Sequence, residues 1–333
     1  MILALETSCD DTCAAILTPG GEVRASIRST QADLHARFGG VVPEIASRRH
    51  LELVVPVIEA ALADAQATLA DVESVAVTQG PGLIGALLVG LSTAKALAYA
   101  RRLPLVPVDH LLGHVAALRL APLALEPPFA CVLASGGHTL VLDVGDYAAP
   151  MRLGGTRDDA AGEAFDKGAR LLGLSDAGGA ALEALARAGD PRRFAFPHVL
   201  RGQSGHDLSF SGLKTALLYT VRDLGRELAG ARADLAASYQ AAIVRQLVER
   251  ALAALDATGH ATLALVGGVA ANASLRAALT VACEARDARL CLLPPALCVD
   301  NAAMIGAAAL AGRPLRPQDY LALDAYARSP LAG

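Results

Sequence analysis

The stretch MILALETSCDDTCAAIL (residues 1–17) contains the pattern that decides the fold. Two apolar runs flank a polar centre, which predicts two strands joined by a turn. The same arrangement returns at Phe129–Ala134 and Thr139–Val144, around the polar turn Ser135–His138. After each hairpin, short apolar strands alternate with segments of helical periodicity. We therefore predict an α/β protein built from a duplicated lobe, with mainly parallel strand pairing.

The composition fits a folded protein of the cell interior. Hydrophobic residues make up 53% of the 333 residues and charged residues 19%, which is enough for a large core and argues against long disorder. The net charge of −4 offers no general basic footprint for nucleic acid, although a local patch stays open. Six cysteines without a C-x-x-C pair are typical of a reduced, cytoplasmic protein. No segment predicts a signal peptide or a membrane span.

Breaks in the pattern indicate the domain organisation. We expect a first lobe over residues 1–120, completed by helices at about 300–333, and a second lobe over residues 129–299. Pro122–Pro128 holds three prolines and is typical of a connection between lobes. Arg187–Gly212, rich in glycine and proline, predicts a loop-rich insertion, a functional loop or lid rather than packed structure.

The motif VDHLLGH (Val108–His114) places two histidines four residues apart. On a helix, His110 and His114 would share one face, within reach of a single metal ion, although a satisfied structural pair is an equally open interpretation. A zinc-protease helix, H-E-x-x-H, needs a glutamate where this chain has Leu111, so the hydrolytic base is missing.

Asp300 precedes an apolar helix, where it could cap the helix or supply a carboxylate ligand. Two histidines with one carboxylate are the ligand set typical of ferrous iron or zinc with open positions.

Three glycine-rich turns each follow a predicted strand, at Gln79–Gly85, Ser135–Gly137 and Gly267–Gly268. Glycine lets a phosphate approach the backbone closely, and a helix N-terminus adds favourable partial charge. None of the turns matches the P-loop or the dinucleotide fingerprint. We favour a nucleotide held between two lobes.

Two acidic clusters have both a structural and a functional interpretation. Acids in DDAAGEAFDK (Asp158–Lys167) can complement a helix dipole, but Asp166 falls in the second turn and could accept hydrogen bonds from a ligand's hydroxyls. Glu6, Asp10 and Asp11 are either ordinary turn residues or an acidic hairpin tip that faces the interlobe cleft and orients a nucleophile.

Taken together, the motifs resemble one family across nearly the whole chain, the tRNA N6-adenosine threonylcarbamoyltransferases, formerly called O-sialoglycoprotein endopeptidases or glycoproteases. The bacterial branch is the most similar. The matching strings are ETSCDDT (Glu6–Thr12), FGGVVPEIASRRH (Phe38–His50), GPGLIGALLVG (Gly80–Gly90), VDHLLGH (Val108–His114), SGGHT (Ser135–Thr139), DDAAGEAFDKGARLLGL (Asp158–Leu174), SFSGLKTA (Ser209–Ala216), GGVAAN (Gly267–Asn272) and VDNAAMIG (Val299–Gly306).

The resemblance implies a fold and a reaction. The fold is that of the actin-like ATPases (ASKHA), with two ribonuclease-H-like lobes around a nucleotide cleft. The reaction transfers the threonylcarbamoyl group from threonylcarbamoyl-AMP to the N6 amine of the adenosine just 3′ of the anticodon, in tRNAs that read codons beginning with A, and it releases AMP.

The resemblance also implies roles for individual residues. His110, His114 and Asp300 match the metal ligands, for one divalent ion per subunit, Fe²⁺ in the first place or Zn²⁺. Asp10 or Asp11 would orient the tRNA amine or take its proton. The residues that match substrate contacts are Leu133, Ala134, Ser135, Gly136 and Gly137 around the phosphate, Asp166, Gly179 and Asn272 at the adenosine, and Glu183 as a further acidic contact.

Partners and rival functions follow from the same comparison. The resemblance implies tRNA, threonylcarbamoyl-AMP, a catalytically inactive paralogue that forms a heterodimer through helices early in the first lobe, and a small P-loop ATPase. An ATPase or phosphotransferase of the same fold is a rival function, since the glycine turns suit ATP equally well. Such an enzyme would not require two histidines and an aspartate as metal ligands, because phosphate-bound magnesium prefers oxygen ligands. Leu111 disfavours a metalloprotease, and the intact ligand set disfavours a non-catalytic scaffold.

Overall fold

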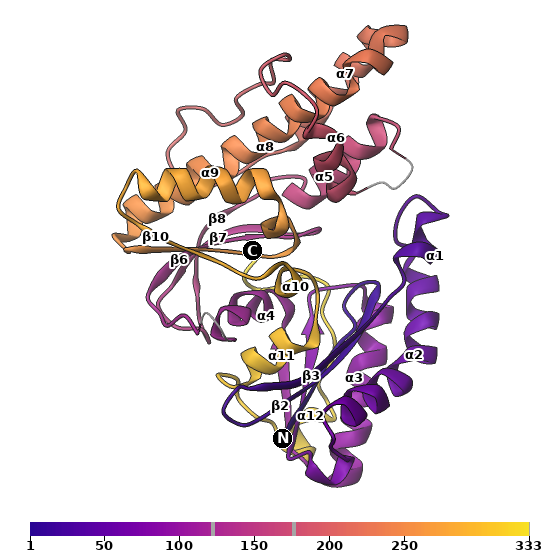
Figure 1. The fold of residues 1–333 in the computed structure, drawn as a ribbon. Coiled ribbons are helices and arrows are strands. Elements are labelled where there is room, and N and C mark those ends of the chain that lie inside the picture. The colour runs from indigo at the N-terminus through magenta and orange to yellow at the C-terminus, as the bar shows by residue number, and fades with distance from the viewer. Residues whose placement is uncertain (121–123, 175–177, 333) are drawn as a thin grey trace. The chain divides into compact units, whose positions relative to one another are not determined.

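The computed structural model, drawn in Figure 1, describes residues 1–120, 124–174 and 178–332. The chain divides into two units, one made of Met1–Glu126, Asp146–Ala149 and Val299–Gly333, the other of Pro127–Gly145 and Pro150–Cys298. Within the predicted connection Pro122–Pro128, the first two residues lie outside the described residues.

The first unit is built on a five-stranded sheet in the order β3-β2-β1-β4-β5. Its strands are β1 (Ile2–Glu6), β2 (Asp11–Leu17), β3 (Val23–Thr30), β4 (Ser74–Gly80) and β5 (Leu105–Asp109). Its helices are α1 (Ala32–Ala36), α2 (Pro43–Asp64), η1 (Leu69–Asp71), α3 (Ile84–Arg101), α4 (His110–Ala116), η2 (Ala117–Arg119), α11 (Ala302–Ala309) and α12 (Pro317–Tyr320).

Both faces of this sheet are covered, and the alternation of side chains along β1 explains how. Leu3 and Leu5 belong to one buried cluster with apolar residues of α2 and α3. Because successive strand residues point to opposite faces, Ala4 faces the other side, where α4 and α11 pack. On that side, a Cβ on Gly306 of α11 would lie 2.2 Å from the Leu17 side chain, so the helix sits directly on the strands. The sheet therefore fixes α4 and the start of α11 as neighbours.

The second unit is built on a five-stranded sheet in the order β10-β9-β6-β7-β8. Its strands are β6 (Phe129–Ala134), β7 (Thr139–Val144), β8 (Met151–Gly155), β9 (Thr262–Val266) and β10 (Arg289–Leu292). Its helices are α5 (Ala161–Leu171), α6 (Gly179–Ala186), α7 (Ser211–Leu224), η3 (Gly225–Glu227), α8 (Leu228–Thr258), η4 (Gly268–Ala271), α9 (Ala273–Glu284) and α10 (Pro295–Cys298).

The two sheets share one topology, which confirms the predicted duplication. In each, three consecutive strands form an antiparallel meander, a later strand pairs parallel to the first of them, and one more strand pairs parallel to that later strand. The expectation of mainly parallel pairing was therefore wrong, because half of the strand pairs are antiparallel. Strands joined by short turns pair antiparallel, whereas parallel partners need a longer crossover, here through helices. The exposed, polar edge strand β3 gave little hydrophobic signal.

The segment Arg187–Gly212 has no helix or strand before α7 begins at Ser211. It is irregular, as expected, but it is attached to α8 and thus differs from the unpacked lid we predicted. Arg250 donates hydrogen bonds to the carbonyls of Leu200 (3.0 Å) and Gly205 (2.9 Å). The segment's two histidines also face α8, with His198 Nε2 2.7 Å from a Glu249 oxygen and His206 Nε2 3.2 Å from the Ala253 carbonyl oxygen.

All six cysteines are free thiols, and five of them are buried. Among the described residues, no helix combines the length and the apolar character needed to cross a membrane.

Candidate metal centre and ligand cavity

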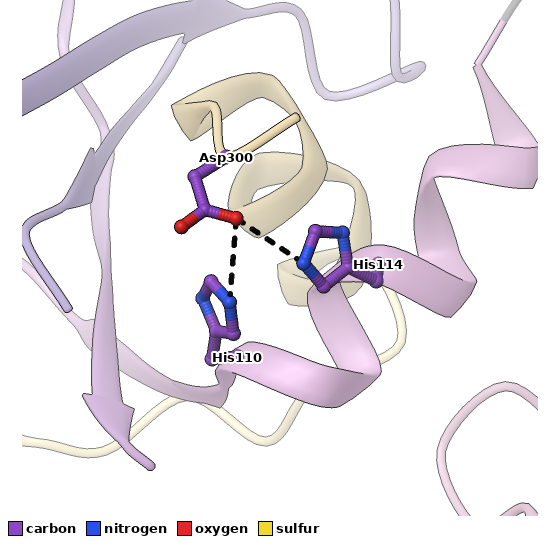
Figure 2. A group of neighbouring side chains, drawn as sticks. All are labelled: His110, His114 and Asp300. Atoms are coloured by element: carbon purple, nitrogen blue, oxygen red, sulfur yellow. Dashed lines mark ion pairs between the residues drawn. The ribbon is translucent and has the colours of Figure 1, made fainter. Parts of the chain in front are cut away.

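His110, His114 and Asp300 come together in the first unit, as Figure 2 shows. Asp300 Oδ1 lies 3.5 Å from His110 Nε2 and 3.2 Å from His114 Nε2. Ligand atoms bound tetrahedrally to zinc at about 2.0–2.1 Å are about 3.3 Å apart. The spacing of the three side chains therefore matches that of ligands around one ion.

The local sequence explains why the two histidines share a face. Asp109 ends β5 and caps α4, because its Oδ1 accepts hydrogen bonds from the backbone N–H groups of Leu111 (2.8 Å) and Leu112 (3.4 Å). With the helix starting at His110, His114 follows one turn later, and the ring centroids are 4.7 Å apart. Leu111, at the position of a protease base, is fully buried and has no acid–base chemistry.

Asp300 is not the cap of α11, which decides between the two interpretations of that residue. The N-cap is Asn301, whose side-chain oxygen accepts a hydrogen bond from Met304 N at 2.9 Å. The carboxylate of Asp300 is therefore available to the histidines. Burial disfavours its charge, but His110 and His114 outweigh this and hold the pKa of Asp300 well below its usual value.

His114 supplies the observation that tests whether a metal fits. Its side chain is fully buried, and neither Nδ1 nor Nε2 has a hydrogen-bond partner among the described residues. Nε2 forms an ion pair with Asp300 Oδ1 at 3.2 Å but no hydrogen bond, and buried polar atoms are almost always hydrogen-bonded, so Nε2 points to a missing partner. A cation bound between His114, His110 and Asp300 would satisfy Nε2 and balance the carboxylate. The donor set present thus fits a divalent metal.

Glu6 lies behind His110 and is fully buried. Its Oε2 is 2.9 Å from His110 Nδ1, and it accepts a hydrogen bond from Thr78 Oγ1 at 2.6 Å. Burial works against the charge on Glu6, but the neighbouring histidine outweighs it and lowers the pKa of the carboxyl. Burial also disfavours the charged form of His110, whereas Glu6 and Asp300 stabilise it and raise the pKa of His110 to about 9.

The three acids of the first turn therefore do not form one acidic tip. Glu6 is turned into the core, while Asp10 and Asp11 are partly exposed. Asp11 opens β2, and its Oδ2 lies 3.5 Å from Arg28 Nη1. Its Oδ1 is buried and has no hydrogen-bond partner among the described residues. Burial raises the pKa of Asp11 to about 6, against the lowering effects of Thr30 and Arg28.

A cavity of about 230 Å³ lies in the second unit, beside the glycine turns. It is lined by Gly136, Gly162, Phe165, Asp166, Gly179, Ala180, Glu183, Gly268, Val269, Ala271 and Asn272. The walls come from the turn after β6, from α5 and α6, and from η4. Backbone groups, two carboxylates and an aromatic ring share the cavity, which is a surface that a nucleoside could occupy.

The cavity brings together only part of the predicted substrate set. Gly136, Asp166, Gly179, Glu183 and Asn272 line it. Leu133, Ala134, Ser135 and Gly137 are not among the lining residues, and the first two are fully buried in β6.

The polar side chains of the cavity differ in how many hydrogen bonds they already form within the protein. Asp166 Oδ1 accepts a hydrogen bond from Gly179 N at 3.0 Å, and burial raises the pKa of its carboxyl. Glu183 Oε1 accepts a hydrogen bond from Ala273 N at 3.0 Å. Asn272 caps α9 through Leu275 N and donates to Gln240 Oε1 at 2.9 Å. Asn272 thus has a structural role that sequence reasoning missed.

The two neighbouring glycines in the turn after β9, Gly267 and Gly268, differ in the space around them. Gly267 has φ +90°, and a Cβ there would lie 2.5 Å from the Ala134 carbonyl oxygen, so only glycine fits. A Cβ on Gly268 would meet nothing within 4 Å, and this residue lines the cavity. Only the second glycine leaves space for a ligand, so a glycine-rich turn is not by itself a phosphate site.

The acids that precede α5 are used for structure. Asp158 accepts hydrogen bonds from Phe210 N (2.8 Å) and Ser211 Oγ (2.7 Å), at the start of α7. Asp159 pairs with Lys167 (3.0 Å) and Lys214 (2.6 Å). The motifs DDAAGEAFDK and SFSGLKTA are therefore two halves of one junction, a pairing that no spacing along the chain reveals.

Sequence reasoning also missed Phe165, Ala180 and Val269 as cavity residues and Glu6 as the partner of His110. Phe165 stands directly before Asp166, so the acidic motif itself was the available signal. Glu6 carried a different signal, since it is a single charge that directly follows the apolar strand residues 2–5.

Comparison with known proteins gives one family. A family model described as tRNA N6-adenosine threonylcarbamoyltransferase matches residues 22–307. The protein of that name from Moorella thermoacetica is 50% identical over 333 residues, covering 99% of this chain and 97% of its own. The one from Geobacter sulfurreducens is 48% identical over 331 residues, with 99% and 97% covered.

Solved structures show the fold. Component A of the (R)-2-hydroxyglutaryl-CoA dehydratase of Acidaminococcus fermentans matches with a TM-score of 0.56 at 16% identity, covering 96% of this chain and 98% of that chain. HypF in a phosphate- and nucleotide-bound form matches with a TM-score of 0.58 at 16% identity, covering 98% and 56%. At such identity the likeness shows the fold alone, and it confirms the predicted actin-like ATPase fold.

Proposed function

The chain belongs to the tRNA N6-adenosine threonylcarbamoyltransferase family, and we propose that it carries out this transfer with a metal ion held by His110, His114 and Asp300. The donor is threonylcarbamoyl-AMP, and the acceptor is the N6 amine of the adenosine just 3′ of the anticodon, in tRNAs that read codons beginning with A. The buried Nε2 of His114, which faces Asp300 Oδ1 without forming a hydrogen bond, carries the metal assignment.

The proposed centre binds one divalent ion per subunit, Fe²⁺ in the first place or Zn²⁺. When bound, such an ion supplies Lewis-acid polarisation of a donor oxygen. The chain contributes two imidazoles and a carboxylate, and the burial of His110 and His114 keeps bulk water from that side of the donor. Exclusion of water protects a reactive mixed anhydride from hydrolysis.

We propose the cavity of the second unit as the site of the adenosine part of the donor. Phe165 offers an apolar ring, and Asp166 has a carboxylate oxygen left for a ribose hydroxyl once Oδ1 has bound Gly179 N. Glu183 and Asn272 border the same space. The open glycine at position 136 supports a phosphate position along Leu133–Gly137, since a Cβ there would meet nothing within 4 Å.

The transfer step then balances as follows. The N6 nitrogen of the tRNA adenosine forms a bond to the carbamoyl carbon, and the bond from that carbon to the phosphate oxygen breaks, so that AMP leaves. The proton of the amine passes to a carboxylate. We propose Asp11, or else Asp10, for this role, because a pKa of about 6 leaves Asp11 ionised yet basic near neutral pH.

The protein partners that we propose are a catalytically inactive paralogue and a small P-loop ATPase. An exposed apolar face on α2 and α3 supports the first of these. Leu51 and Val55 lie one turn apart on α2 and are 66% and 53% exposed, and Ile84 and Leu88 on α3 are 42% and 40% exposed. Apolar surface of this kind on paired helices is typical of an interface.

Two further assignments belong to the same proposal. We propose lobes over residues 1–120 with 300–333 and over residues 129–299, with the segment 187–212 as an insertion of the second lobe. A tRNA substrate also implies work in the cytoplasm.

Transfer assays with purified protein, both partners, tRNA and threonylcarbamoyl-AMP test the proposal. Wild type is expected to form threonylcarbamoyladenosine and to contain one metal ion per subunit. His110→Ala and Asp300→Ala are expected to lose transfer and to bind metal much more weakly, so that the purified variants contain well below one ion per subunit. His198→Ala is the matched control, because His198 pairs with Glu249 on α8 instead. Full transfer by His110→Ala would overturn the metal assignment, and casein cleavage or phosphate transfer without tRNA modification would overturn the function.

A further inference from the structure

Glu6 is a buried carboxylate aimed at one of the two histidines. We propose that Glu6 is a positioning residue, which holds His110 with its proton on Nδ1 and so presents Nε2 to the metal. The inference rests on the proposed metal centre and concerns a residue outside its three ligands. It follows from the contacts around the carboxylate.

The carboxylate of Glu6 is held in place from two directions besides His110. The backbone N–H of Ser8 donates a hydrogen bond to Oε1, and Thr78 Oγ1 donates one to Oε2 at 2.6 Å. Thr78 belongs to β4, the parallel neighbour of β1, so the sheet itself sets the position of the carboxylate. The Glu6 side chain therefore cannot rotate away from His110 without breaking one hydrogen bond from β4 and one from the turn after β1.

The orientation of His110 follows from that anchored carboxylate. An ionised carboxylate only accepts hydrogen bonds, so the 2.9 Å contact between Glu6 Oε2 and His110 Nδ1 requires a proton on Nδ1. A neutral imidazole with Nδ1 protonated has its lone pair on Nε2. That atom is the one 3.5 Å from Asp300 Oδ1, on the side where the three ligands converge. A carboxylate behind a ligating histidine is a recurrent feature of metal sites, where it also raises ligand basicity.

His114 lacks this support, which makes the effect specific to one ligand. Its Nδ1 is buried without a hydrogen-bond partner among the described residues. Its Nε2, like that of His110, faces Asp300 Oδ1, at 3.2 Å. The two histidines thus offer the same atom to the centre, but only one of them has its tautomer set by a carboxylate.

A purely structural role would not explain the choice of residue. The remaining residues of β1 are apolar and buried. Replacement of a buried charged pair by apolar residues is often neutral or stabilising, so stability alone does not call for a glutamate here.

Metal affinity of the purified chain tests the inference, measured by Zn²⁺ and Co²⁺ titration against a chelator. Glu6→Gln is expected to weaken binding by about tenfold to hundredfold. The same factor is expected in a His114→Ala background, whereas in a His110→Ala background Glu6→Gln should cause no further loss. Thr12→Val is the matched control, since Thr12 contacts the buried His50 Nδ1 at 2.8 Å and should leave metal affinity unchanged.

The tautomer of His110 in the wild-type zinc form, read from nitrogen chemical shifts, needs no substitution that might unfold the chain. Protonated Nδ1 with Nε2 bound to the metal is expected, and coordination through Nδ1 would overturn the inference. The inference would also be overturned if Glu6→Gln weakened metal binding as much in the His110→Ala background as in the wild-type background. It would be overturned as well if Glu6→Gln alone bound metal within about twofold of the wild-type affinity. Failure of wild type to bind metal would overturn the proposed centre itself.

Discussion

The hydroxyl of Tyr326 donates a 2.8 Å hydrogen bond to Asp109 Oδ2, across 217 positions of sequence. Ser329 Oγ donates to the same oxygen at 2.7 Å. Asp109 uses its other oxygen to cap α4, so the C-terminal segment is bonded to the residue that starts the histidine helix. The same C-terminal segment is also bonded to the end of β4, where Gln79 Nε2 donates a hydrogen bond to the Asp324 carbonyl oxygen at 2.7 Å.

Tyr326→Phe is expected to destabilise the protein by about 1–2 kcal/mol, because a hydrogen bond to a charged acceptor is lost. Urea unfolding measures the change in the free energy of unfolding. Tyr219→Phe on α7 is the control, since Tyr219 is 52% exposed and should stay within about 0.5 kcal/mol of wild type. Equal stability of Tyr326→Phe and wild type would show that the tail does not support α4.

Substitutions of the neighbouring residues Asp300 and Asn301 should affect metal binding and helix capping separately. Asn301→Ala is expected to lower stability by about 1 kcal/mol, because the cap of Met304 N is lost, while one metal ion per subunit is retained. Asp300→Asn keeps the cap and is expected to lose the metal. Elemental analysis together with unfolding of the metal-free protein measures both effects. The reverse pattern would mean that Asp300 acts through the helix.

Two adjacent glycines should respond differently to one added methyl group. Gly267→Ala is expected to destabilise by more than about 2 kcal/mol, because the backbone has φ +90° and a Cβ would lie 2.5 Å from the Ala134 carbonyl oxygen. Gly268→Ala meets no atom within 4 Å but narrows the cavity. It should keep its stability and lose about tenfold in AMP affinity, measured by calorimetry. Unchanged AMP binding by Gly268→Ala would argue against the cavity as the nucleotide site.

The rate of transfer should depend on pH through Asp11, whose pKa burial raises to about 6. A raised pKa means that the carboxyl is protonated, and unable to take a proton, below that pH. We therefore expect kcat/KM to fall about tenfold per pH unit below pH 6 and to level off above it. In Asp11→Asn, kcat/KM should be low and should not show this fall below pH 6. A fall in kcat/KM of the same size below pH 6 in Asp11→Asn would exclude Asp11 as the base.

Local patterns were sufficient for much of the fold. The bounds of β6 and β7 agree with the predicted strands Phe129–Ala134 and Thr139–Val144, because both strands are buried along almost their whole length and so form continuous apolar runs. The edge strand β3 was missed, since its half-exposed sequence VRASIRST carries few apolar residues. The hairpins β1–β2 and β6–β7 were predicted, but the third strand of each meander, β3 and β8, was not, so the share of antiparallel pairing was underestimated.

For the site, spacing alone could pair His110 with His114 and could name Asp300 as one of two possibilities. It could not decide between cap and ligand, because both use the same carboxylate. Asn301 decides it by taking the cap. Nor could spacing find the contact from Glu6 to His110, which are 104 positions apart and meet only because β1 and β5 flank β4 in one sheet.

The sequence by itself determined the duplicated α/β hairpins, the i, i+4 histidine pair and the family, because these depend on local periodicity and on ordered motifs. Only the tertiary structure decided which carboxylate is free, which histidine nitrogen is supported and which glycines leave space. Those properties depend on burial and on hydrogen bonds between residues far apart in the chain, and the sheet brings such residues together only when the chain has folded.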